Sequence, residues 1–169
     1  MSIEKVREYF RGYDMEDKVL EFEVSSATVR LAAIALGTEE ARIAKTMSFK
    51  KDEGCILVIT AGDVKIDNAK YRHTFGLKAK MLTPDEVMKF VGHAIGGVCP
   101  FAVKEGVIGI YIDESVKRFA TVFPACGSSN SAIELTPEEL EEIRKKEERK
   151  DRLHQNYLKR KANGKQKEY

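Results

Sequence analysis

The segment IAKTMSFKKDEGCILVITA, residues 43–61, indicates how this chain folds. It contains two runs rich in apolar and β-branched residues, Ile43–Phe49 and Cys55–Ala61, separated by the short polar segment Lys50–Gly54. Such a pattern is typical of two neighbouring strands joined by a turn. We therefore expect these two runs to pair in one sheet.

The segments on either side of this pair predict a mixture of helices and strands. Apolar spacing, capping residues and terminating glycines predict helices over residues 2–13, 27–36 (capped by Ser25-Ser26 and ended by Gly37), 66–75 and 83–91, with a short helical start at Thr38. Further strands are expected over residues 19–24, 107–112, 119–123 and 131–135. Because strands and helices do not alternate regularly, the order favours an α+β fold with a mixed sheet over a doubly wound architecture.

The C-terminal part predicts a separate, charged segment. Thr136-Pro137-Glu138-Glu139 is typical of a capped helix start. The nine residues Arg144–Arg152 are all charged, so a helix there has little to bury. We expect one body over residues 1–142, including the N-terminal helix, and a charged helical or disordered tail over 143–169. The last residues, 163–169, are expected to be disordered.

Composition narrows the classes of function. Residues 1–136 carry 18 basic and 19 acidic side chains and residues 137–169 carry 11 and 8, so charge predicts only a weak, salt-sensitive affinity for RNA. The three cysteines form no CxxC pair, which disfavours a disulfide framework or a zinc site and fits a reducing compartment. No apolar run approaches the roughly 20 residues that span a bilayer, and the first residues lack the apolar region of a signal peptide. We expect a cytoplasmic protein that does not contact membranes.

Lys45 is the first candidate functional residue. Alternation along the strand places Ile43, Lys45, Met47 and Phe49 on one face, and that face is otherwise apolar. A lysine among such neighbours either reaches past them to solvent or lines a pocket, where its cation can meet an anionic or carbonyl group. Both interpretations remain open from the strand alone.

The second candidate is the glycine-rich segment Gly92–Pro100. Glycine permits positive φ and lets backbone N–H groups approach a ligand, where they can stabilise an anion or a developing oxyanion. The segment is not a P-loop or a dinucleotide fingerprint, because it lacks GK[ST] and does not follow a strand. A purely structural turn between a helix and a strand is the alternative.

Three nearby features have weaker support. His93 could be a base or a polar wall of a pocket, although a histidine bonded to backbone at a helix end is the more common situation. Cys99 could be a nucleophile, but no base is evident beside it, and a small buried structural cysteine is the favoured interpretation. The segment Pro124–Ser131 could line a pocket or form a surface turn. No metal-binding motif is present.

Taken together, these segments resemble the YbaK/EbsC family. The resemblance lies in Arg42-Ile43-Ala44-Lys45-Thr46, Gly96-Gly97-Val98-Cys99-Pro100-Phe101, Ala125-Cys126-Gly127 and Ile133–Leu140, and it extends over residues 18–142. The family is related to the editing (insertion) domain of bacterial prolyl-tRNA synthetase. It implies a mixed sheet, or partly closed barrel, surrounded by helices.

The resemblance also implies a function, namely hydrolysis of mischarged aminoacyl-tRNA, with tRNA for proline as the expected substrate. No metal or cofactor is expected; an aminoacyl-tRNA synthetase is a possible partner, and the oligomeric state stays open. The residues expected to act in catalysis are Lys45, Gly96, Gly97, Val98, Cys99 and Pro100. Those expected to contact the substrate are Thr46, His93, Ile95, Phe101, Ala125, Gly127 and Ser128.

Some positions depart from the family pattern. Ala125 and Ala132 stand where some family members have a serine and an acidic residue, and Asn130 stands where a glycine is common. These changes surround the expected pocket and leave the amino acid that is removed undetermined. A non-catalytic module that binds tRNA or a synthetase is the alternative function, and a hydrolase using Cys99 is a third.

Overall fold

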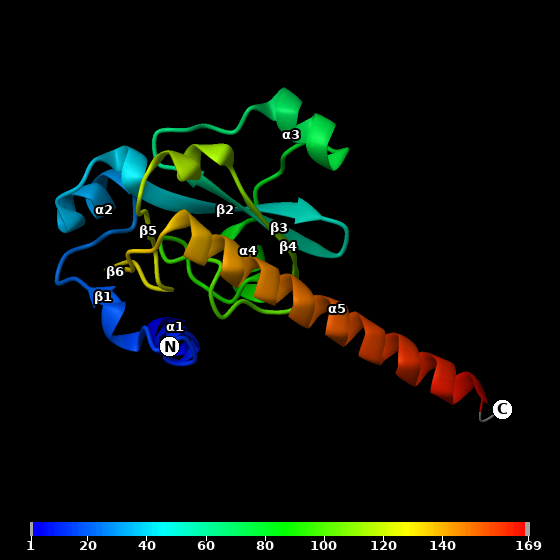
Figure 1. Cartoon of the computed structure of the whole chain (residues 1–169). Coiled ribbons are helices and arrows are strands. Elements are labelled where there is room, and N and C mark those ends of the chain that lie inside the picture. Colours follow the sequence, from blue (N-terminus) through cyan, green and yellow to red (C-terminus); the bar gives the residue numbers. More distant parts are fainter. Residues whose placement is uncertain (1, 168–169) are drawn as a thin grey trace.

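The architecture was described from a computed structural model that covers residues 2–167. Its helices are α1 (Ser2–Arg11), α2 (Val29–Leu36), α3 (Asn68–Phe75), α4 (Pro84–Phe90) and α5 (Pro137–Lys167), with short 3-10 turns at Glu16–Lys18, Glu40–Arg42 and Glu114–Arg118. Its strands are β1 (Leu20–Glu21), β2 (Ile43–Lys51), β3 (Gly54–Ala61), β4 (Val107–Ile112), β5 (Phe123–Pro124) and β6 (Ser131–Ala132). Figure 1 shows the helices arranged around a curved central sheet.

The central sheet is mixed, which confirms the predicted fold class. Its strand order is β4-β3-β2-β5. The pair β2–β3 is antiparallel, as expected for a hairpin, whereas β4 and β5 each run parallel to their neighbour. A second, two-stranded antiparallel pair joins β1 to β6.

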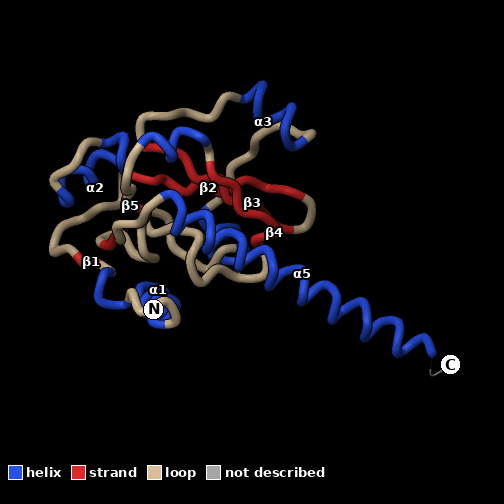
Figure 2. The backbone as a smooth tube through the Cα atoms, in the orientation of Figure 1, coloured by secondary structure: helices blue, strands red, loops and turns tan. Residues whose placement is uncertain are grey.

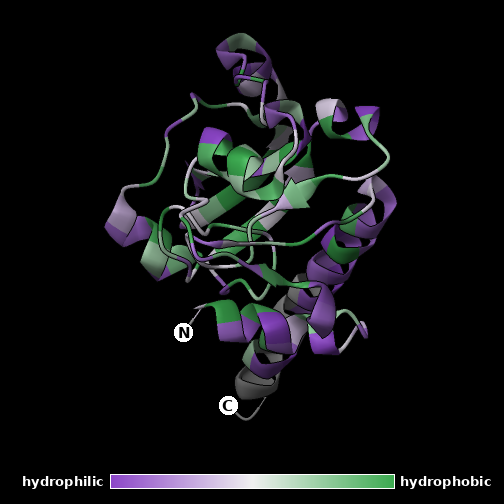
Figure 3. Cartoon of the chain, turned by 90° about the vertical axis from the view of Figure 1, so that its left-hand side faces the viewer, coloured by the Kyte–Doolittle hydropathy of each residue, from purple (hydrophilic) through white to green (hydrophobic). Residues whose placement is uncertain are grey.

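The two faces of the sheet are covered differently. One face carries Leu57 and Ile59 into the main core, where they join Phe10 of α1 and Leu140 of α5. On the other face, two smaller clusters pack under α2 and under α3, the first around Ile43 and the second around Phe49, Val58 and Tyr71. Figure 3 shows apolar residues concentrated on the central strands and hydrophilic residues prominent on the helices around them. The second face is therefore closed at two places with a gap between them.

Local sequence explains most helix boundaries. Thr83 and Glu86 form a reciprocal capping box at the start of α4. Asp67 and Thr28 cap α3 and α2 through their side chains, and Gly37 ends α2 in the left-handed conformation. The first turns of these helices therefore have partners for their free N–H groups.

Several predicted boundaries need correction. The strand expected over residues 19–24 is reduced to Leu20–Glu21, and the one over 119–123 to Phe123–Pro124, because both segments run along the edge of the body with few strand partners. Helix α2 begins after Thr28 rather than after Ser26. The short helical start expected at Thr38 is present as the 3-10 turn Glu40–Arg42, with Glu39 rather than Thr38 at its N-cap position. The strand over 131–135 is formed only at Ser131–Ala132, with Leu135 in an isolated bridge to Val122.

Helix α5 is longer than expected. It runs without interruption to Lys167, whereas the sequence predicted disorder from residue 163, and Glu168 and Tyr169 lie outside the described residues. Figure 2 shows its second half extending beyond the rest of the molecule. No helix within residues 2–167 is both long and apolar enough to cross a lipid bilayer.

Candidate functional site

The outer edge of β2 is interrupted, and Lys45 and Thr46 lie at the interruption. Pairing with β5 covers Ile43 and Ala44 only. Further along, Ser48 accepts a hydrogen bond from Leu82 N–H, and Lys50 donates one to Lys80. Because peptide groups alternate in direction along a strand, the N–H and C=O of Thr46 point to the same edge, between these two attachments.

The side chain of Lys45 lies on the second face of the sheet, as predicted. It is half-buried, and its register partner across the ladder is the buried Thr60. Burial lowers the pKa of the Lys45 ammonium, attraction to Asp63 opposes that shift, and repulsion from Lys65 adds to it. Lys45 is therefore a partly desolvated cation with one acidic neighbour.

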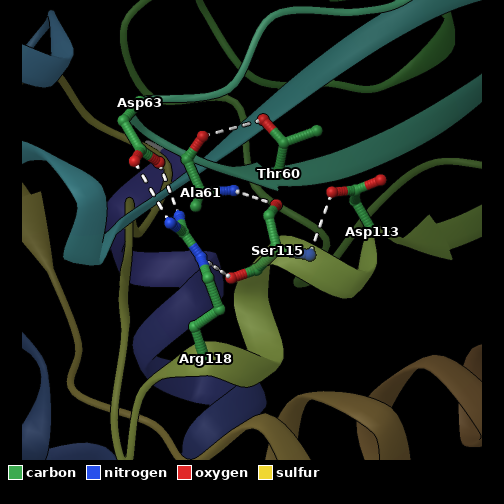
Figure 4. A network of polar contacts seen from close by, with 6 residues as sticks. All are labelled: Thr60, Ala61, Asp63, Asp113, Ser115 and Arg118. Atoms are coloured by element: carbon green, nitrogen blue, oxygen red, sulfur yellow. Dashed lines mark hydrogen bonds and ion pairs between the residues drawn. The ribbon is translucent and has the colours of Figure 1, made fainter.

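A polar network fixes that acidic neighbour (Figure 4). The guanidinium of Arg118 donates to both carboxylate oxygens of Asp63, at 2.6 and 3.3 Å, and its Nε donates to the Ser115 carbonyl at 2.9 Å. The Ser115 hydroxyl accepts from the Ala61 N–H at 3.0 Å, which ties the network to the end of β3. Arg118 lowers the pKa of the Asp63 carboxyl, so Asp63 is held as an anion near Lys45.

The glycine-rich segment is a packed loop. Gly96 has φ +93°, and a Cβ there would lie 3.0 Å from the Cβ of Ala27. At Gly97 a Cβ would lie only 2.5 Å from backbone atoms of Gly127 and Ser128. Glycine is required at both positions, at Gly96 by backbone conformation and at Gly97 by the close approach of a second segment.

The backbone donors of this loop are not all available. The N–H of Gly97 donates to Ala94 O at 3.0 Å, and Pro100 has no N–H. The N–H groups of Gly96 and Val98 have no acceptor among the described residues. These two are candidates for binding an anionic group, and so are the N–H groups of Ile95 and Cys99, which also have no acceptor among the described residues.

A cavity of about 220 Å³ joins the interrupted edge to the loop. The residues expected in the site that line it are Lys45, Thr46, Ile95, Gly96, Val98 and Ala125. The walls also include the start of α2, Phe123 of β5 and Met81 before α4. The two strongest sequence signals, a lysine on β2 and a glycine loop about 50 residues later, thus meet at one cavity.

Other expected residues, some of them in the loop itself, do not line the cavity. They are His93, Gly97, Cys99, Pro100, Phe101, Gly127 and Ser128. His93 is fully buried, its Nε2 lies 2.7 Å from Phe101 O, and its Nδ1 contacts the hydroxyl of Ser2 in α1. Since a carbonyl only accepts, Nε2 carries the proton and the neutral ring links α1 to the loop.

Cys99 is poorly suited to be a nucleophile. It is fully buried, and burial raises the pKa of its thiol to about 12. Its Sγ lies 3.5 Å from His93 Nε2, but that nitrogen is already used by Phe101 O. A thiolate is strongly disfavoured in this environment, which argues against the cysteine-dependent hydrolase.

The cavity includes polar residues that were not expected from the sequence. Ser26, Thr28 and Ser48 line it, and the hydroxyl oxygen of Thr46 is buried without a hydrogen-bond partner. From the sequence, Ser26 was expected only as part of a helix cap and Thr28 within the helix, so their place in the cavity wall was not foreseen. Within residues 2–167, Lys45 is the one ionisable side chain that lines this cavity.

The comparisons with known proteins identify the family of the chain. The sequence model of the family described as "Aminoacyl-tRNA editing domain" matches residues 23–143. The chain belongs to that family. This confirms the resemblance drawn from Lys45 and the Gly96–Pro100 loop, and the match leaves α1 and most of α5 outside the editing domain.

Relatives of the editing domain include one close in length. The uncharacterized protein YwhH of Bacillus subtilis is 55% identical over 144 residues, covering 85% of this chain and 91% of that protein. The proline–tRNA ligase of Halalkalibacterium halodurans is 27% identical over 105 residues, which are 62% of this chain but 18% of the ligase. The editing domain thus resembles a small part of that ligase.

Solved structures show the same fold. A candidate trans-editing enzyme for prolyl tRNA synthetase has a TM-score of 0.77 and 29% identity, covering 85% of this chain and 91% of that chain. The hypothetical protein APE2540 has a TM-score of 0.73 and 26% identity, covering 82% and 93%. Both similarities extend over most of the editing domain.

Proposed function

We propose that this protein hydrolyses the ester bond between an amino acid and the 3′ end of a mischarged tRNA, with tRNA for proline as the substrate. The observation that carries the proposal is a cavity lined by Lys45, Gly96 and Val98, in a member of the editing-domain family; the N–H groups of Gly96 and Val98 have no acceptor among the described residues. The similarity to a candidate trans-editing enzyme for prolyl tRNA synthetase supports the choice of tRNA.

The chemistry needs few groups because an aminoacyl ester is already reactive. Water adds to the ester carbonyl, the bond from that carbon to the ribose oxygen breaks, and a proton passes to the ribose oxygen. The products are a free amino acid and uncharged tRNA. In the proposed mechanism the amides of Gly96 and Val98 stabilise the oxyanion, and Lys45 attracts the anionic or carbonyl groups of the aminoacylated end.

The cavity wall restricts which amino acid fits. Ala125 and Ala132 both line it, together with apolar side chains such as Phe123 and Ile95. The apolar part of such a pocket discriminates by size, and one methylene is worth about 1–3 kcal/mol. We propose that a small amino acid is removed, by a reaction that needs no metal and takes place in the cytoplasm.

The direct test measures the rate at which wild type and a variant of the proposed site hydrolyse a panel of mischarged tRNAs. Lys45→Ala should lower kcat/KM on the best substrate on the order of 100-fold, because it removes a charge aligned with the reacting group. Lys65→Ala is the matched control: Lys65 lies close enough to influence Lys45 but does not line the cavity, so its rate should stay within about twofold of wild type. Chelating divalent metals should leave both rates unchanged.

Two results would contradict the proposal. Equal rates for wild type and Lys45→Ala would remove Lys45 from the mechanism. Failure to hydrolyse any aminoacyl-tRNA, combined with binding of the aminoacylated end, would favour a non-catalytic tRNA-binding module, which the departures at Ala125 and Ala132 motivate.

A further inference from the structure

Helix α5 divides into two halves with different charge and different surroundings. Residues 1–148 of the chain carry 21 basic and 25 acidic side chains. Residues 149–167 carry eight basic side chains and one acidic one. The modest net charge of +2 for the whole protein therefore conceals an acidic body and a strongly basic helix end.

The first half of α5 packs against the body, and several of its charges are paired. Leu140 and Ile143 are buried in the main core. Arg144 forms ion pairs with Glu141 and Glu148, and Lys150 pairs with Glu147 at 3.5 Å. The acidic residues of this helix are thus concentrated where it contacts the body.

The second half, residues 152–167, has the opposite character. It contains six basic residues and no acidic one, so no i,i+4 ion pair can form inside it. The side chains described there, those of Leu153 and residues 156–162, are all exposed. Lys161 lies over the ring of Tyr157, 5.2 Å from its centroid, and that ring is itself 53% exposed. Figures 1 and 2 show this half standing clear of the body.

A helix of this composition is unfavourable by itself. The adjacent Lys159, Arg160 and Lys161 repel one another, and Gly164 lies within the helix. Nothing described in the protein compensates for that cost. A polyanion would, because a row of phosphates neutralises the cations and releases the counterions condensed on the nucleic acid.

We propose that residues 152–167 of α5 bind the phosphate backbone of RNA, and that this RNA is the tRNA whose 3′ end enters the cavity. The choice of tRNA rests on the proposed function, whereas the binding of RNA rests on the charge and exposure of the helix. The 31 residues of α5 reach about 46 Å at 1.5 Å per residue, so its basic end contacts nucleotides remote from the 3′ terminus.

The test measures binding of uncharged tRNA to the full-length protein by fluorescence anisotropy over a range of salt concentrations. The variant Lys159→Gln/Arg160→Gln/Lys161→Gln should weaken binding at least tenfold at low salt. The plot of log affinity against log salt should also become less steep by roughly 2 to 3, because each lost phosphate contact reduces the magnitude of the slope by somewhat less than one. The matched control, Lys18→Gln/Lys78→Gln/Lys89→Gln, removes three exposed cations from the body and should keep the wild-type slope.

A conservative exchange separates charge from helix structure. Lys159→Arg/Arg160→Lys/Lys161→Arg should bind like wild type, because every positive charge is retained. Circular dichroism of the free proteins should show that the glutamine variant keeps the helix content of the wild type, so that weaker binding reflects the lost charge.

The proposal is overturned if the glutamine variant binds tRNA with the wild-type affinity and slope. It is also overturned if sedimentation shows a dimer that Leu153→Ala/Tyr157→Ala dissociates, with tRNA affinity unchanged, because the helix then binds a second copy of this chain. Because the ligand is uncharged tRNA, the result does not depend on hydrolysis and is separate from the test of the proposed function.

Discussion

Thr46 has an unusual environment for a side chain on a central strand. Its hydroxyl oxygen is buried and has no hydrogen-bond partner, although the residue lies in the wall of the cavity beside Lys45. A buried hydroxyl without a partner destabilises the folded state, so a protein gains stability by replacing it with an apolar group of the same shape. Its presence suggests that the partner is supplied by the ligand.

Thr46→Val should therefore separate stability from activity. The Tm should be unchanged or raised, because the variant removes an unsatisfied polar atom. The value of kcat/KM for the aminoacyl-tRNA should fall roughly tenfold, the equivalent of one hydrogen bond of about 1.4 kcal/mol. Calorimetry and deacylation kinetics on the same samples provide the two measurements.

Thr60→Val is the control for this experiment. Thr60 is the register partner of Lys45 and is also buried, but its hydroxyl donates to Ala61 O at 3.1 Å. Replacing it should cost about 1 kcal/mol of stability and leave the rate unchanged. If Thr46→Val is as active as wild type, its hydroxyl does not meet the substrate.

At the scale of elements, α1 holds the glycine loop from behind. The contacts run from Ser2 to the ring of His93 and from that ring to the carbonyl of Phe101. A Cβ added to Gly127 would lie only 2.9 Å from the carbonyl oxygen of Ser2, so α1 also packs closely against that glycine. Helix α1, which lies outside the part of the chain that matches the family, thus fixes two segments that flank the cavity.

The buried ring makes this connection sensitive to pH. Burial is the main cause that lowers the pKa of His93, and repulsion from Lys5 lowers it a little further. The hydrogen bond to Phe101 O acts in the opposite direction and raises the pKa. The thiol of Cys99 also faces the ring. With a folded pKa below the unfolded one, His93 contributes full stability above the unfolded pKa of about 6.5. That contribution is lost as pH falls from there toward the folded pKa.

His93→Gln tests this effect because a glutamine amide can still donate to Phe101 O but does not titrate. Between pH 7 and pH 5 the Tm of wild type should fall by more than the Tm of the variant, as measured by thermal denaturation at matched ionic strength. Parallel curves for the two proteins would show that His93 is not the group that titrates.

Prediction from sequence was most successful where one element decides the outcome. The alternation around Lys45 and the capping box at Thr83 are local patterns, and both were correct. The bond of His93 to the backbone carbonyl of Phe101 agrees with the more common situation expected from the sequence, whereas its contact with Ser2, 91 positions away, was not predictable. The use of the Gly97 N–H by Ala94 O was equally hidden, since it depends on how the loop turns.

At the scale of the whole molecule, α5 belongs to two environments. The sequence predicted that the body ends at residue 142. In the structure Ile143 is still buried in the main core, with 2% of its surface exposed, whereas Leu153 is 69% exposed. Counting charge over residues 137–169 as one block hid the change along the helix. The acidic turns near the body cancelled the basic turns at the far end.

Two alanine substitutions locate the end of the folded body. Ile143→Ala should lower the free energy of unfolding by about 2–5 kcal/mol, because it leaves a cavity in the core. Leu153→Ala should change it by less than about 0.5 kcal/mol, since that side chain is exposed and far from the core. Chemical denaturation of both variants is the measurement, and a large loss for Leu153→Ala would place the boundary later in the chain.

The contact between Ser2 and His93 also affects how the protein can be handled. A purification tag or fluorescent label attached ahead of Ser2 would lie directly beside the contacts that hold the glycine loop in place. Such an addition could change turnover without altering any residue of the cavity. Figure 1 shows α3 well separated from α1 and from the far end of α5, so a label on its exposed residue Arg72 would avoid both.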